Sequence, residues 1–478
     1  MSIRTWLRVP RIRRGLAASA VILAAGGLVL ARTPASAAPL RPTASATVAT
    51  GENSVTFSAK GAHGSLALSH THLLAGGERR FFAELDLTAD AAERALERAP
   101  LSIAVVLDTS GSMGGEKMEQ AKQAVVRLIR DLRDDDEIAF IRYSTDSELV
   151  QPLARAGAVR AQLVARVQGL VAEGGTSIAP ALRQGLRALS DARKGRVLRV
   201  VLASDGLDST RVESESIARE SAERGVTISS MGIGLDFDAS YMASVARSGR
   251  GNFAFVNDGP ALASFLRREL EETATTTIEG ATARLQLPAG VRLVRAVGAD
   301  AKPLGDGEIE LSLGSLFAGD ERRVVIELAA SVEAGEARAL QGRVSFRNVG
   351  GDSVEARVPS LSIRGSADER TVAEGRDGTV LARAMSATAS LRQIEATEAY
   401  EKGDLTRAQA LIDQNIVDLR AAEVAAPAPA VEALQQQARS YDETKRTFAA
   451  APPRSAEGSM AAKRSLEKDT GNVARQVF

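Results

Sequence analysis

Three oxygen-bearing side chains stand at alternate positions directly after a short apolar run. The run extends from Leu101 to Leu107, and the side chains are those of Asp108, Ser110 and Ser112. A run this continuous predicts a strand buried on both faces, which would place Asp108 at the carboxyl end of a central strand. Gly111 permits a tight path in which both hydroxyls turn to the side of the carboxylate. One carboxylate with two hydroxyls is a set of hard oxygen ligands that suits Mg²⁺, Mn²⁺ or Ca²⁺.

Two further segments are expected to reach the same place. The loop from Glu173 to Ser177 precedes a predicted helix and offers the hydroxyl of Thr176. The apolar run from Val197 to Ala203 is followed by a second carboxylate, Asp205. Because the carboxyl ends of parallel strands meet at one edge of a sheet, these side chains should lie close to Asp108.

The elements that position these residues follow an alternating pattern between Leu101 and Thr273. Short apolar runs alternate with longer segments of helical period, which predicts a mostly parallel sheet covered by helices on both faces. The predicted strands are Ser102–Asp108, Glu137–Tyr143, Glu148–Leu153, Val197–Ser204, Val226–Ile233 and Asn252–Val256. The predicted helices are Glu116–Leu132, Ala158–Val171, Ile178–Leu189, Ser209–Arg224 and Pro260–Glu272. The strands at 137 and 148 are expected to form an antiparallel hairpin at one edge.

This segment resembles the von Willebrand factor type A domain, a doubly wound, Rossmann-like α/β fold. The metal-ion-dependent adhesion site of that family uses the pattern Asp-x-Ser-x-Ser, then a Thr, then an Asp, in that order. The matching residues here are Asp108, Ser110, Ser112, Thr176 and Asp205. The family often has Thr where this chain has Ser204, a departure outside the assigned ligands. The resemblance covers roughly 170 of the 478 residues, and it implies one divalent cation with an open coordination position that a partner's carboxylate fills.

The regions on either side of this domain have different sequence patterns. Strand-like alternation at 55–87, including Leu66 to Leu74 and Phe81 to Leu87 around Gly76-Gly77, predicts a hairpin. The strands at 275–364 predict an antiparallel sandwich, and we hypothesise that the N-terminal strands join it, which would make the central domain an insertion. After Gly365 the chain is predicted to be helical, with a helix pair broken at Gly403-Asp404. The predicted organisation is a signal peptide at 1–37, a flexible spacer at 38–54, N-terminal strands at 55–99, the α/β domain at 100–273, the sandwich at 274–366, a helical region at 367–448 and a disordered tail at 449–478.

The N-terminus has the pattern of an export signal. A basic stretch to Arg14, an apolar run at 15–31 and small residues at 35–37 predict cleavage before Ala38. The alternative is a retained membrane anchor at 15–31, because such a run is at the short limit of what crosses a bilayer. Either outcome places the protein outside the cytoplasm, in the periplasm, at the cell surface or secreted.

Composition excludes several function classes. Residues 1–37 hold six arginines and no acid, so the remainder has 54 basic and 60 acidic residues and lacks the basic character that nucleic-acid binding needs. The chain has no cysteine, which excludes disulfides and thiolate metal sites. His70 and His72 could hold zinc, but no third ligand is recognisable, and an ordinary strand face is the preferred interpretation. The sequence predicts no oligomeric state.

These observations favour an exported, non-enzymatic binding module that engages an exposed carboxylate of a protein or surface ligand through Mg²⁺, or through Mn²⁺ or Ca²⁺. One alternative is a structural component of the cell envelope whose metal only stabilises loops. A second is a Mg²⁺-dependent phosphoryl-transfer enzyme. Against the enzyme, the loops contain neither a candidate general base nor a phosphate-binding lysine.

Overall fold

The computed structural model describes residues 50–91, 100–193, 195–205, 208–235, 237–256, 259–274, 276–348 and 351–475. The predicted signal peptide, the alternative anchor and most of the predicted spacer therefore lie outside the described residues. Strands begin at Thr50, which is inside the range expected to be spacer. Within the described ranges, no helix combines the length and the apolar character needed to span a bilayer.

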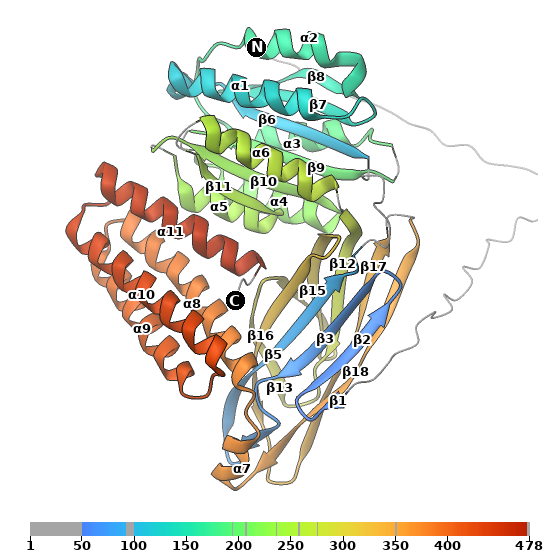
Figure 1. Ribbon diagram of the computed structural model, residues 1–478, viewed down its shortest axis with the longest axis vertical. Helices are drawn as coiled ribbons and strands as arrows, with labels where there is room; N and C mark the ends of the chain where they lie inside the picture. Colours follow the sequence, from blue (N-terminus) through green and yellow to red (C-terminus); the bar gives the residue numbers. More distant parts are fainter. Residues whose placement is uncertain are drawn as a thin grey trace, which may run out of the picture. The chain divides into compact units, whose positions relative to one another are not determined.

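A six-stranded sheet forms the middle of the central domain (Figure 1). Its order is β11-β10-β9-β6-β7-β8, and every neighbouring pair is parallel except β7 and β8. The strands are β6 (Leu101–Asp108), β7 (Glu137–Tyr143), β8 (Ser147–Arg155), β9 (Val197–Ser204), β10 (Val226–Ile233) and β11 (Arg250–Val256). This confirms the predicted mostly parallel sheet with one antiparallel edge.

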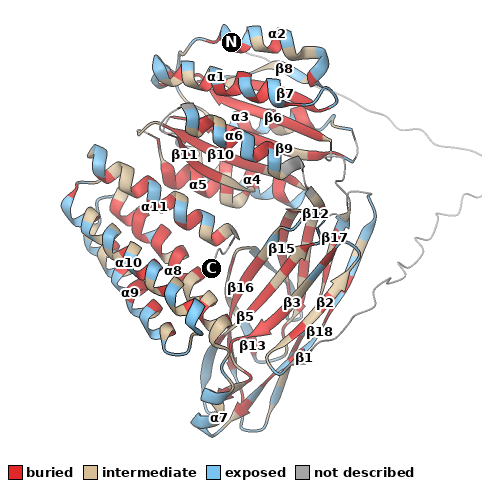
Figure 2. Ribbon diagram, in the orientation of Figure 1, coloured by how far each residue is buried: buried red, intermediate tan, exposed pale blue. Residues whose placement is uncertain are grey.

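Helices cover both faces of this sheet and bury its strands (Figure 2). One face packs against α1 (Glu116–Asp131), α2 (Ala156–Gln168) and α6 (Gly259–Ala274). The other packs against α3 (Ile178–Leu189), α4 (Arg211–Glu223) and α5 (Ala239–Ser248). All eight residues of β6 are buried, as expected for a strand covered on both sides. Helix α5 was not predicted from the sequence.

The sandwich consists of two six-stranded sheets around one apolar core. The first sheet has the order β1-β2-β3-β5-β16-β13 and the second β14-β15-β12-β17-β18-β4. The N-terminal strands are β1 (Thr50–Gly51), β2 (Ser54–Ala59), β3 (Ala62–Leu68), β4 (His72–Leu74) and β5 (Glu78–Ala89). The later strands are β12 (Thr276–Gln286), β13 (Val291–Val297), β14 (Asp300–Gly305), β15 (Glu308–Phe317), β16 (Glu321–Ser331), β17 (Ala337–Asn348) and β18 (Ser353–Ser366).

The N-terminal strands are integral to this sandwich. Strand β5 lies between β3 and β16, and it pairs with β16 from Glu78 to Thr88. The two halves of the sandwich thus come from either side of the central domain, which is an insertion between β5 and β12. The hairpin expected around Gly76-Gly77 differs in detail, because the chain leaves the first sheet after Leu68 and β4 pairs with β18 in the other sheet.

The C-terminal region is helical, and a helix replaces the predicted disordered tail. Its helices are α7 (Glu369–Glu374), α8 (Gly378–Glu401), α9 (Leu405–Glu423), α10 (Ala428–Ala450) and α11 (Ala456–Arg475). The predicted break at Gly403-Asp404 is present, with Gly403 at φ 84° and Asp404 capping α9. Helix α11 packs against α8, α5 and β11. Its sequence looks like a tail because its buried face mixes a few apolar residues such as Leu466 with polar ones such as Asp469.

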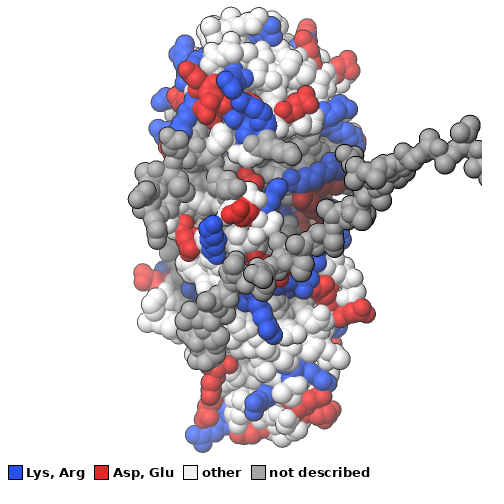
Figure 3. All heavy atoms as spheres, turned by 90° about the vertical axis from the view of Figure 1, so that its right-hand side faces the viewer, with Lys and Arg blue, Asp and Glu red and all other residues white. Residues whose placement is uncertain are grey.

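Acidic and basic side chains are interspersed on the face of the molecule drawn in Figure 3. No basic region dominates the described surface visible in that view. This mixture agrees with the near balance of acids and bases in the sequence.

Candidate metal centre

Asp108 is the last residue of β6 and is fully buried. Its Oδ1 accepts a hydrogen bond from the backbone N of Ser110 at 2.8 Å, and its Oδ2 accepts one from the hydroxyl of Ser204 at 2.7 Å. Burial raises the pKa of Asp108, the hydrogen bonds from Ser110 and Ser204 oppose this shift, and the charge of Asp205 adds to it. The carboxylate is therefore held rigidly in a place where its charge is poorly compensated.

A chain of hydroxyls connects Asp108 to the second carboxylate. The Oγ atoms of Ser110 and Ser112 lie 3.0 Å apart, and the Oγ of Ser112 donates to Oδ1 of Asp205 at 2.8 Å. Asp205 follows the end of β9 and its side chain is fully buried. Ser112, in contrast, is exposed, so the cluster opens to solvent on its side. The structure thus brings four of the five residues predicted from the sequence into one hydrogen-bonded cluster.

Thr176 lies in the adjoining loop, and no hydrogen bond between described residues involves its side chain. Two contacts tie this loop to the segments that carry the cluster, one to Gly111 and one to Asp208. The backbone N of Gly111 donates to the carbonyl of Gly174 at 3.0 Å, and the backbone N of Ile178 donates to Oδ2 of Asp208 at 2.6 Å. Asp208 belongs to the loop that follows Asp205, so it caps the first turn of α3 from a different segment. Thr176 is partly exposed beside the cluster.

Lys117, at the start of α1, contacts the cluster, which the sequence pattern did not predict. Its Nζ donates to Oδ2 of Asp205 at 2.6 Å and to the carbonyl of Ser112 at 3.4 Å. The Lys117 side chain is 27% exposed, whereas that of Asp205 is not exposed. The ammonium therefore compensates one of the two buried carboxylates.

The donor set fits a hard divalent cation. Two carboxylates and at least two hydroxyls converge at one edge of the sheet, all of them oxygen ligands of the kind that Mg²⁺, Mn²⁺ and Ca²⁺ take. With Lys117 as the nearby cation, one negative charge in the cluster stays uncompensated. No group of three or more His, Cys, Asp and Glu side chains within the described ranges is arranged to hold a metal. A cation here would accordingly depend on the serine hydroxyls, and Asp108, Ser110, Ser112, Thr176 and Asp205 would hold it.

The two histidines considered as zinc ligands make local contacts instead. Nδ1 of His70 lies 2.9 Å from the hydroxyl of Ser69, and Nδ1 of His72 lies 2.9 Å from that of Thr71. Burial lowers the pKa of His70 to about 4.

Comparison with known proteins supports the assignment of the central domain. Residues 102–268 match the family model of the von Willebrand factor type A domain. A solved structure titled von Willebrand factor type A from Catenulispora acidiphila is similar with a TM-score of 0.66 and 19% identity, over 86% of this chain and 96% of that one. At this identity the likeness shows the fold alone, but it extends beyond the central domain.

Curated relatives share a smaller part of their length. The uncharacterized protein YfbK of Escherichia coli is 28% identical over 48% of this chain and 40% of its own length. The uncharacterized protein sll0103 of Synechocystis is 28% identical over 55% of this chain and 65% of its own length. This chain thus spans less than two thirds of either relative.

Proposed function

Because residues 102–268 form a von Willebrand factor type A domain, a family that typically mediates protein–protein interactions, we propose that this chain is a non-enzymatic binding module. It engages an exposed carboxylate of a partner protein or surface ligand through a divalent cation held at the carboxyl edge of the central sheet. The observation that carries the proposal is the pair of buried carboxylates, Asp108 and Asp205, joined through hydroxyls that reach solvent at Ser112.

The electrostatics of the cluster support recognition of an acidic group. A divalent cation held by two carboxylates retains attraction for a third negative group. The exposed side of the cluster, at Ser112 and Thr176, leaves room for that group to approach. The partner's carboxylate would complete the coordination of the cation, so binding would require the metal.

Calorimetry tests the metal site. We expect wild-type protein to bind Mg²⁺ or Mn²⁺ at one site, and we expect Asp108→Ala to lose this binding because one of the two carboxylates is removed. The matched control is Glu173→Gln, which removes an exposed carboxylate from the loop of Thr176 and should leave the affinity unchanged. Unchanged affinity in Asp108→Ala with a native circular dichroism spectrum would disprove the ligand assignment.

Capture of a partner tests the binding function. Immobilised wild-type protein should retain specific proteins in Mg²⁺ and release them in chelator, Asp108→Ala should not retain them, and Glu173→Gln should. A short peptide rich in Glu should compete with the captured protein. Retention that is insensitive to chelator and to Asp108→Ala, with metal changing only the melting temperature, would favour a structural envelope component.

The proposed location is outside the cytoplasm, and it rests on the N-terminal sequence pattern alone. The mature protein should begin at or near Ala38. Intact mass of the protein isolated from its cells checks this, and a species that retains Trp6 and fractionates with membranes would favour the anchor.

A further inference from the structure

A cavity lies at the end of the central sheet opposite the candidate metal centre. It has a volume of about 300 Å³ and is lined by the starts of β9, β10 and β11, by α4 and α5, by strands of the sandwich and by α11. The candidate metal centre follows the carboxyl ends of β6 and β9, whereas this cavity lies at the amino ends of β9, β10 and β11. The two sites are therefore at opposite ends of the parallel strands. We call this space the arginine cavity.

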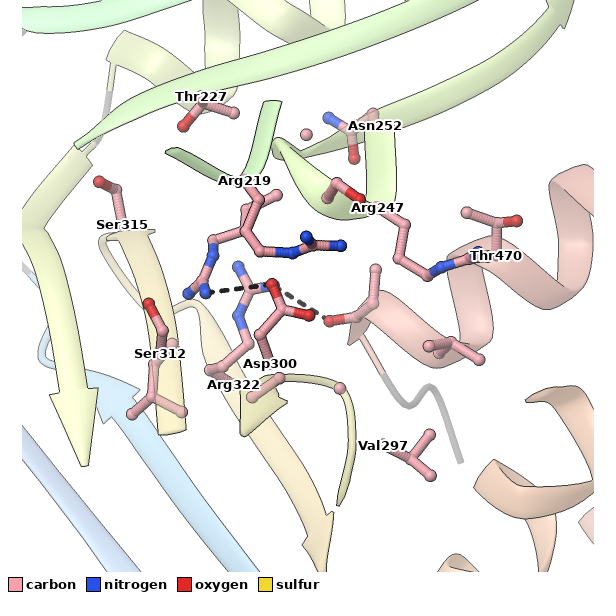
Figure 4. A pocket seen from close by; sticks show the side chains of 18 of the residues that line it. Arg219, Thr227, Arg247, Asn252, Val297, Asp300, Ser312, Ser315, Arg322 and Thr470 are labelled. Carbon is pink, nitrogen blue, oxygen red and sulfur yellow. Dashed lines mark hydrogen bonds and ion pairs between the residues drawn. The ribbon is translucent and has the colours of Figure 1, made fainter. Parts of the chain in front are cut away.

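Five arginines line the arginine cavity, and they come from separate elements. They are Arg199 of β9, Arg219 of α4, Arg247 of α5, Arg250 of β11 and Arg322 of β16. Figure 4 shows Arg219 of α4 and Arg322 of β16 beside Asp300, while Arg247 of α5 extends toward Thr470 of α11. Guanidinium groups repel one another, so such convergence is costly unless carboxylates or a bound anion compensate it.

The carboxylates that line the cavity are already engaged. Asp300 is 3.7 Å from Arg250, and Asp320 is 3.7 Å from Arg322. Glu272 accepts a hydrogen bond from Asn252 at 2.7 Å.

Arg247 is left without an ion pair within 4 Å among the described residues. Glu215 and Glu398 are the acids that act on it most strongly, yet Arg211 binds both, at 2.8 and 3.2 Å. Burial lowers the pKa of Arg247 despite these two acids.

Several buried donors of the cavity have no acceptor among the described residues. They are Nη1 of Arg247, Nε and Nη1 of Arg250, and the hydroxyl of Thr470. Thr470 is 3% exposed and the Arg250 side chain 11%. Buried donors of this kind are rare in folded proteins because each one left unsatisfied is destabilising. All of them line the arginine cavity, and N–H and O–H donors of this kind bind the oxygens of anions.

The backbone of Arg250 has an energetically unfavourable conformation. Its φ is 55°, a left-handed conformation that residues other than glycine rarely adopt. Its side chain passes over Gly314 of β15, where an added Cβ would come within 3.2 Å of Cδ of Arg250. Two separate elements are thus shaped so that this guanidinium reaches the cavity.

We propose that the arginine cavity binds a small oxyanion, a ligand that carries a phosphate or carboxylate group, through the guanidinium groups of Arg247 and Arg250 and the hydroxyl of Thr470. Planar guanidinium groups bind both kinds of oxyanion with paired hydrogen bonds. The ligand would contact the central domain, the sandwich and α11 at once, because Arg247, Ser312 and Thr470 belong to these three parts. The metal site takes no part in this binding.

The test uses the full chain in chloride buffer without divalent ions, with inorganic phosphate and citrate as probes in separate titration calorimetry experiments. We expect saturable binding of at least one probe with a stoichiometry of one. Arg247→Met should weaken it by about tenfold or more, because hydrogen bonds to a charged group are lost. Thr470→Val should weaken it less. The matched control is Arg224→Gln, which removes an arginine that is 78% exposed at the end of α4 and should change nothing.

A second measurement keeps the test decisive if a variant is poorly stable. Without probe, Arg247→Met should melt no lower than wild type, since it removes a buried cation that lacks a close carboxylate. Arg219→Gln changes an exposed residue of the cavity and should weaken binding without unfolding the protein. The proposal is overturned if neither probe binds wild type saturably, or if binding persists in folded Arg247→Met and Arg219→Gln. Asp108→Ala should still bind the probe, which separates this inference from the metal site.

Discussion

At the scale of single residues, the candidate metal centre combines residues that the sequence predicts as metal ligands with contacts that it does not predict. The order of Asp108, Ser110, Ser112, Thr176 and Asp205 could be read directly, because each stands next to a predicted strand or helix. Lys117 could not, because a lysine in the first turn of a helix is usually a solvated side chain. Its contact with Asp205 depends on the packing of α1 beside the end of β9.

Lys117 and a metal ion would compete for the charge of Asp205. We predict that Lys117→Met lowers the free energy of unfolding of the metal-free protein by about 3 kcal/mol, because a buried carboxylate loses its partner. The same variant should bind Mg²⁺ more tightly, because a positive charge has been removed from the site. Chemical denaturation in chelator and calorimetry with Mg²⁺ measure the two effects.

The control for this variant is Lys122→Met on the same helix, which breaks the pair with the largely exposed Glu119. Lys122→Met should lower the free energy of unfolding by about 0.5 kcal/mol and leave the Mg²⁺ affinity as in wild type. Equal metal affinity in wild type and Lys117→Met would show that Lys117 has no influence on the site.

Ser204 and Asp208 illustrate what spacing alone cannot reveal at this scale. Ser204 stands where the family often has Thr, and its hydroxyl donates to Asp108. Asp208 caps α3 across a loop boundary, although it lies far in sequence from Ile178. Both roles depend on tertiary contacts between segments, which a linear pattern does not contain.

At the scale of elements, regular apolar runs were predicted well and mixed ones were not. Strands β7, β9 and β10 begin and end where the sequence places them, because their buried residues are almost continuous. The sequence does not predict helix α5, because most of its residues are alanine or serine and nearly all of them are buried. The helix therefore has no polar face, and its sequence lacks the alternation of apolar and polar residues by which a helix is recognised. The sequence of α11 predicts a tail, because polar residues occupy part of the face that the fold buries.

Helix α11 should contribute to stability in a way that a disordered tail would not. Leu466 is fully buried in the same core cluster as α3, α4 and α5. We predict that Leu466→Ala lowers the free energy of unfolding by about 2 to 5 kcal/mol, whereas Arg464→Ala on the exposed side of the helix stays within about 0.5 kcal/mol. Denaturant titrations compare the two, and equal, negligible effects would mean that this segment does not pack.

Asp469 makes the stability that α11 contributes dependent on pH. Burial raises its pKa to about 7, and the hydrogen bond from Tyr441 at 2.7 Å opposes the shift. In the unfolded chain the same group ionises near pH 4. The folded protein therefore binds this proton more tightly, and the contribution of Asp469 to stability falls as pH rises from about 4 to about 7.

We predict that Asp469→Asn removes this contribution. Relative to the variant, wild type should lose up to about 4 kcal/mol between pH 4 and pH 8. Comparing the two proteins by denaturant titration at several pH values isolates Asp469 from the other acids. Parallel pH profiles would show that folding does not shift the pKa of Asp469.

At the scale of the whole molecule, the sandwich is assembled from segments on both sides of the central domain. The alternation of apolar and polar residues in the strands predicted this topology. The sequence could not show that β5 becomes an interior strand between β3 and β16. Removing the N-terminal strands would thus expose β16 and part of the core around Leu85.

The insertion predicts which fragments fold. Residues 276–478 alone should aggregate, because the exposed edge of β16 and the open core have no cover. Residues 50–91 joined by a flexible linker to 276–478 should aggregate less than fragment 276–478, since both sheets are then complete, although both fragments lack the packing of α11 against α5. Size-exclusion chromatography and circular dichroism compare the two fragments, and a stable, monomeric fragment 276–478 would contradict the role of β5.

The insertion also fixes how the central domain responds to mechanical force. The chain enters it at the start of β6, and α6 returns from the end of β11 to leave it near Ala274, so both connections are at the edge opposite the metal cluster. A pull on a partner bound at the metal edge would run along the strands and be shared by two covalent tethers. Strand β6 is bonded on both sides, to β7 and β9. Pulling β6 out along its own axis would break its hydrogen bonds to both neighbours together, whereas peeling would break them one at a time, so unfolding the domain in this direction would require the larger force.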